Sequence, residues 1–84
     1  MNASYVYGIF QCCEENKLPD LHIAHAHYQV DHKLPGGLTE KQVNEFIGRH
    51  YNDLVKAYAS HDPIVFEEAV KACVAADIEK ENKK

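Results

Sequence analysis

The 84-residue sequence contains no tryptophan, one methionine and a single arginine, Arg49. Its nine basic residues are outnumbered by thirteen acidic ones, so the formal net charge is −4 with the histidines neutral. Proteins that bind DNA or RNA depend on clustered lysine and arginine side chains to neutralise phosphates. The shortage of basic residues therefore argues against a nucleic acid as the partner.

A long hydrophobic run is also missing from the sequence. No stretch approaches the roughly 20 apolar residues that a membrane-spanning helix needs. The N-terminus has no basic start followed by an apolar segment, which is the pattern of a secretory signal. We therefore expect no membrane association, and the cytoplasm is the expected location.

Cysteine is scarce, and its arrangement argues against a disulfide framework. The three cysteines are Cys12, Cys13 and Cys73, an odd number of which two are adjacent. Small secreted domains that rely on disulfides carry an even number of spaced cysteines. We therefore expect reduced thiols that pack as small apolar side chains.

The chain length limits the size of the hydrophobic core. Residues 1–84 are enough for one domain, which buries roughly 60–65% of the surface that its unfolded chain exposes. The hydrophobic content of 45% is ordinary for a globular protein. Because so small a core leaves a thin margin of stability, and oligomerisation is a common remedy, we expect a homo-oligomer.

The clearest helical pattern covers residues 39–60. Thr39 and Gln42 have the spacing of a capping box, in which each side chain bonds the backbone of the other residue. Apolar residues then recur at helical spacing. They are Val43, Phe46, Ile47, Tyr51, Leu54 and Tyr58. This pattern predicts one continuous helix.

A second helical pattern covers residues 62–81. Asp62 is suited to the N-cap and Pro63 to the first helical position. The short connection after residue 60 predicts that the two helices form an antiparallel hairpin. Residues 82–84 are expected to fray.

The N-terminal half is less regular. Residues 1–18 have an apolar face and predict a helix that ends before Pro19. Residues 20–32 fit either a helix or a strand, and we favour the helix because no partner strand is evident. The predicted fold is therefore all-α, a small bundle of three to four helices built on the C-terminal hairpin.

Histidine is the least ordinary component of this sequence. In a helix over residues 20–32, His22, His25 and His32 lie in one polar stripe. Histidines three positions apart share a helix side and can bind one metal ion. His32 lies two turns further on, so tetrahedral zinc needs a ligand from another element. The primary expectation is a solvated face without a cofactor, and the alternative is a site for zinc or another divalent transition metal.

Two other polar groups interrupt apolar helix faces. His50 lies on the apolar face of residues 39–60, and Asp77 lies on that of residues 62–81. An unpartnered polar group in a protein interior costs about 1–3 kcal/mol. In an antiparallel hairpin the two residues lie about one turn apart, so we expect a structural His50–Asp77 pair.

A glycine turn precedes the helix that starts near Thr39. Gly36, Gly37 and Thr39 offer backbone N–H groups that can bind an anion such as a nucleotide phosphate. The segment lacks the lysine and the fixed glycine spacing of a phosphate loop, and Glu40 would repel an anion. A flexible turn is the other interpretation.

The aromatic content favours binding of a protein partner. The sequence has five tyrosines, and a small core does not easily pair all of their hydroxyls. They are Tyr5, Tyr7, Tyr28, Tyr51 and Tyr58. No nucleophile stands in a recognisable catalytic setting, so we expect no enzyme. We predict a non-catalytic interaction or regulatory module that binds a partner protein as a homo-oligomer.

Overall fold

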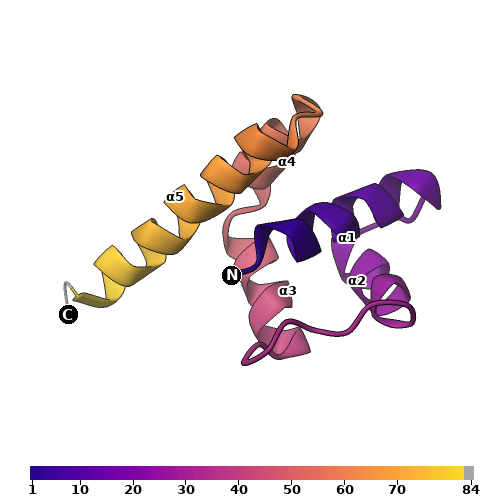
Figure 1. Ribbon diagram of the computed structural model, residues 1–84, viewed down its shortest axis with the longest axis horizontal. Coiled ribbons are helices and arrows are strands. Elements are labelled where there is room, and N and C mark those ends of the chain that lie inside the picture. Colours follow the sequence, from indigo (N-terminus) through magenta and orange to yellow (C-terminus); the bar gives the residue numbers. More distant parts are fainter. Residues whose placement is uncertain (83–84) are drawn as a thin grey trace.

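The computed structural model describes residues 1–82, and helices form most of this part (Figure 1). They are α1 (Ala3–Glu15), α2 (Leu21–Gln29), α3 (Glu40–Arg49), α4 (Tyr51–Ala59) and α5 (Pro63–Asn82). No strand occurs in residues 1–82, so the all-α prediction is confirmed. Of the predicted frayed tail, Asn82 belongs to α5, and residues 83–84 lie outside the described part.

Side-chain caps fix the starts of the first two helices. Asn2 Oδ1 accepts a hydrogen bond from the backbone N–H of Tyr5 at 3.0 Å, which caps α1. Asp20 Oδ1 accepts one from Ile23 N–H at 2.9 Å, which caps α2. These bonds satisfy N–H groups that have no partner within the helix. The segment after Pro19, which fitted either a helix or a strand, therefore forms a helix.

The prediction of one continuous helix over residues 39–60 is wrong. The chain breaks at His50, whose dihedral angles are φ −114° and ψ 23°, and α3 ends there. Gly48 lies two positions earlier and weakens this turn, because glycine is a poor helix former. Leu54 N–H still donates to the His50 carbonyl at 2.9 Å, so α4 starts at once. The apolar periodicity continues through the break and therefore does not reveal it.

A tight turn connects α4 to α5. His61 adopts a positive φ of 57°, and Asp62 Oδ1 accepts a hydrogen bond from Ile64 N–H at 2.9 Å. Helix α5 begins at Pro63, as the Asp62–Pro63 pair predicts. The turn brings α4 and α5 into contact, and the two helices lie side by side in Figure 1.

Helix α1 organises the core, because α2 packs against it and α5 also contacts it. Rings from three helices meet there, with centroids 5.2–6.4 Å apart. They belong to Tyr7, Phe10, Tyr58 and Phe66. The C-terminal end of α5 projects beyond the other helices (Figure 1). Within residues 1–82, no helix has the length and apolar character needed to cross a membrane.

Candidate functional site

Most of the tyrosines that we predicted at a partner surface are packed inside the chain. Tyr5 is buried, and Tyr7, Tyr28 and Tyr58 are half-buried. Burial raises the pKa of Tyr58 to about 12, with Glu14 adding to the effect. Tyr51 is 51% exposed and is therefore the one member of the set that is open to a partner.

Tyr5 belongs to a hydrogen-bonded chain that links three helices. Its hydroxyl lies 2.9 Å from Nε2 of the fully buried His25, and Nδ1 of His25 lies 2.8 Å from Asn44 Oδ1. Because an amide oxygen only accepts, Nδ1 is the donor, and Nε2 accepts the hydroxyl proton of Tyr5. Burial raises the pKa of Tyr5, and Tyr28 and Glu40 raise it further. Both ring nitrogens of His25 are therefore in use.

The predicted polar stripe of His22, His25 and His32 does not form. His22 and His32 are exposed, whereas His25 lies in the core. The ring of His32 stacks on Tyr28, with centroids 3.9 Å apart and planes 5° from parallel. The sequence did hold a signal for this result, because His25 follows Leu21 by four positions on the same helix side. The arrangement brings no support to the zinc hypothesis at these residues.

The glycine turn and the residues after it form the start of α3. Gly37 takes a positive φ of 83°, which glycine adopts without strain. Thr39 N–H donates to Gln42 Oε1 at 3.0 Å, and Gln42 N–H donates to Thr39 Oγ1 at 3.2 Å. The predicted capping box thus uses the Thr39 N–H, one of the groups that an anion would need at Gly36, Gly37 and Thr39.

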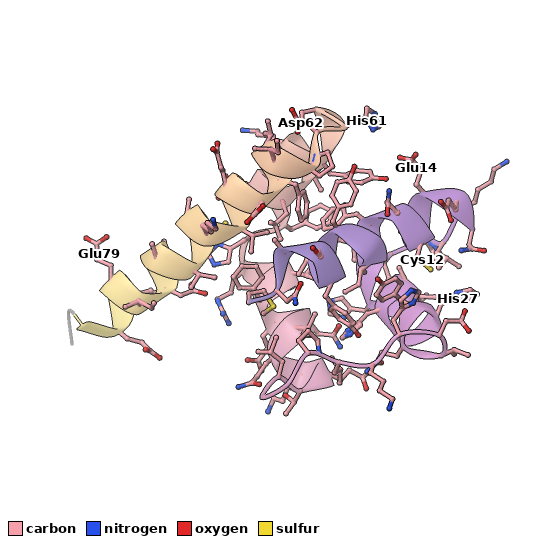
Figure 2. The ribbon with its side chains drawn as sticks, viewed as in Figure 1. Cys12, Glu14, His27, His61, Asp62 and Glu79 are labelled. Carbon is pink, nitrogen blue, oxygen red and sulfur yellow. The ribbon has the colours of Figure 1, made fainter. Side chains whose placement is uncertain are left out.

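A cysteine–histidine pair that we did not predict lies between α1 and α2. Cys12 Sγ is 3.4 Å from His27 Nδ1, and Asn16 Nδ2 is 3.5 Å from the same sulfur (Figure 2). The pair lines a cleft of about 290 Å³ that also includes Asp31. Fifteen residues separate Cys12 from His27, so only the packing of α1 against α2 reveals the contact. Its immediate effect is to join these two helices.

The expected contact between His50 and Asp77 is present. His50 Nε2 lies 2.9 Å from Asp77 Oδ1, and Arg49 Nη2 donates to Asp77 Oδ2 at 3.0 Å. Burial alone would raise the pKa of Asp77, but the hydrogen bonds and charges of Arg49 and His50 outweigh it and lower that pKa. The sequence did not identify Arg49 as a partner, because Arg49 and Asp77 lie 28 residues apart.

A groove of about 330 Å³ lies beside this pair, between α3 and the C-terminal half of α5. Its apolar lining consists of Met1, Leu38, Phe46, Val74 and Ile78. Its polar lining consists of Gln42, Glu45, Arg49, Asp77 and Glu81, so three carboxylates accompany one guanidinium. The groove is therefore lined by apolar and acidic side chains together.

No known protein family, curated protein or solved structure matches this chain. The exposed aliphatic side chains of α5 are then the main guide to function. Ile64 is 67% exposed, Val65 42% and Ile78 53%. Ile64 and Ile78 are 14 residues apart and therefore lie on the same side of the helix, whereas Val65 lies on another side. In residues 1–82, the contacts of α5 cover only one of its faces.

Proposed function

We propose that the protein is a small non-catalytic interaction module that binds a second copy of itself through α5. The observation that carries this proposal is the exposure of Ile64, Val65 and Ile78 on a helix whose C-terminal half projects beyond the body (Figure 1). Pairing two such helices would remove apolar surface from water, at about 25 cal/mol per Å². Because the core of so small a domain supplies little stability, association with a second copy is a common way to increase it.

The α3–α5 groove supports a second copy as the occupant. Its lining includes the carboxylates of Asp77 and Glu81, and Lys80 lies on the same helix as both. In a two-fold interface each copy presents the same surface, so residues i and j exchange places. Two antiparallel α5 helices would bring Lys80 of each copy toward the carboxylates that line the groove of the other. Ile78 of each copy would then fill the other's groove.

The proposed location is the cytoplasm. Cys12, Cys13 and Cys73 are free thiols, and burial raises the pKa of Cys73, with Asp53 and Asp77 raising it further. A raised pKa keeps a thiol protonated and less reactive. Structural thiols of this kind suit a reducing compartment.

The test compares Ile78→Glu with the matched control Val30→Glu. Val30 is 81% exposed at the end of α2 and does not line the groove. Replacing a buried isoleucine by a charge removes about 1.5–3 kcal/mol of apolar burial, which weakens association roughly 10–100-fold. Size-exclusion chromatography with light scattering should report a dimer for the wild type and Val30→Glu, and a monomer for Ile78→Glu at the same concentration.

Circular dichroism of Ile78→Glu should match the wild type, because the side chain is exposed in one copy. A dimer that survives in Ile78→Glu would reject the groove as the interface. A monomeric wild type would reject the proposal itself, and a different protein would then be the partner to seek.

A further inference from the structure

Three side chains with different metal-binding chemistry meet where α4 starts beside the middle of α5. They are His50, Asp53 and Cys73, and one ring nitrogen, one carboxylate oxygen and Sγ all lie within 4.8 Å of one another. Asp53 is exposed, His50 is half-buried and Cys73 is buried. The cluster is therefore open to solvent at the Asp53 carboxylate, whereas the Cys73 thiol lies in the core.

The surroundings hold His50 in an orientation suited to a metal ligand. Nε2 faces Asp77 Oδ1 at 2.9 Å, which leaves Nδ1 as the ring nitrogen with a free lone pair. Histidines that bind a metal ordinarily donate their other ring N–H to a carboxylate or a carbonyl. Arg49 holds the second oxygen of Asp77 at 3.0 Å, so the supporting carboxylate is itself fixed.

We propose that His50, Asp53 and Cys73 bind a single Zn²⁺ ion that links α4 to α5, with water as the fourth ligand. Nitrogen, sulfur and carboxylate ligands together suit zinc rather than magnesium or calcium. On binding, Cys73 loses its thiol proton to solvent, and the thiolate and the Asp53 carboxylate together balance the charge of the ion. This inference does not depend on the proposed dimer.

The geometry requires only a small adjustment. Ligand atoms around tetrahedral zinc lie roughly 3.3–3.8 Å apart, given bonds of about 2.0–2.3 Å. All three ligand atoms already lie within 4.8 Å of one another, and the exposed Asp53 side chain can rotate toward the ion. The adjoining cleft is about 430 Å³, and the short side chains of Ala69, Ala72 and Ala76 on its α5 side leave room for the ion and its water. Lys56 also lines this cleft, and its exposed side chain must swing away from the ion.

The test is a titration of the untagged, chelator-treated full chain with Co²⁺, which replaces zinc and gives thiolate bonds a charge-transfer absorption. We expect the band to grow to one equivalent of Co²⁺ and to disappear when Zn²⁺ is added. Cys73→Ser should abolish the band. Cys12→Ser is the matched control, because Cys12 is also a buried thiol beside a histidine, and it should keep the band.

Two further variants test the ligands at positions that are not fully buried, and circular dichroism confirms that each variant is folded. Asp53→Asn should weaken Co²⁺ binding at least tenfold, because the variant loses a charged ligand. Asp77→Asn should weaken it about 10–100-fold, as loss of a supporting carboxylate does. Absence of the band in the wild type, its persistence in Cys73→Ser or unchanged affinity in Asp53→Asn would each overturn the proposal.

Discussion

Two helical glycines differ in the space around them, which is filled at Gly8 and open at Gly48. A Cβ added at Gly8 would collide with the ring and hydroxyl of Tyr28, whereas one added at Gly48 would meet nothing within 4 Å. Gly8 is therefore the point at which α1 and α2 approach closely. Gly48 has no such contact and costs helix stability in α3.

We predict that alanine has opposite effects at these two positions. Gly8→Ala should lower the free energy of unfolding by about 1–2 kcal/mol, because the clash exceeds the gain in helix propensity. Gly48→Ala should raise it by about 0.5–1 kcal/mol, through propensity alone. Urea denaturation measures both values. Stabilisation by Gly8→Ala would contradict the described packing of Tyr28 on α1.

His25 is the residue whose role differs most from its sequence-based interpretation. His25→Ala should lower the free energy of unfolding by about 2–4 kcal/mol, because it leaves a cavity and strands the Tyr5 hydroxyl and the Asn44 amide. The control His22→Ala removes an exposed ring from the same helix and should change stability by no more than about 0.5 kcal/mol. Thermal or urea unfolding distinguishes the two. Equal changes in the two variants would mean that the hydrogen bonds of Tyr5, His25 and Asn44 do not contribute to the free energy of unfolding.

At the scale of helices, the break between α3 and α4 depends on contacts made by His50. Its Nε2 bonds Asp77 of α5, and its ring lies 4.9 Å from that of Phe46. The carboxylate of Asp77 thus connects the α3–α4 junction to α5. The pKa of Asp77 is lowered from its usual 3.8, so its ionised form is favoured in the folded state.

The sign of this shift sets a pH dependence. A lowered pKa contributes stability above pH 3.8, and that contribution is lost as the pH falls through the lower folded value. Asp77→Asn should therefore lower the free energy of unfolding by about 1 kcal/mol at pH 7, since the pair is partly solvated. The difference from the wild type should shrink at pH 3. Urea unfolding at pH 7, 5 and 3 checks this, and an equal difference at all three values would argue against the ion pair.

Local sequence signals predicted the starts of α3 and α5 but missed the start of α4 and most contacts between helices. The Thr39–Gln42 capping box and the Asp62–Pro63 start are present because each depends on residues within four positions. The break at His50 and the burial of His25 depend on Asp77, Tyr5 and Asn44, which lie 19–27 residues away. A pattern within one segment carries no information about contacts so far apart in the sequence. The periodicity of residues 39–60 therefore predicted one helix where the structure has two.

The same reason explains the candidate sites. The His50–Asp77 contact was predictable because both residues interrupt apolar faces, and an unpaired polar group there is costly. The Cys12–His27 pair was not, because neither residue is unusual in its own segment. The groove beside α3 appears only once α5 is placed against it.

At the scale of the whole molecule, α5 distinguishes this chain from a self-sufficient bundle. Its twenty residues extend about 30 Å, and the longest dimension of the molecule is 40 Å. Only part of this length packs against α1 and α4, while Ile64, Val65 and Ile78 are exposed at its two ends. A second copy covers these side chains without requiring any change in the fold.

The most direct measurement of the central claim is sedimentation velocity of the wild-type chain over a wide concentration range. Association through α5 predicts a shift, as concentration rises, from the monomer to a species of twice its mass. Ionic strength should have a modest effect, because aliphatic contacts supply most of the attraction and the Lys80 contacts only steer it. A single monomeric species at every concentration would contradict the account.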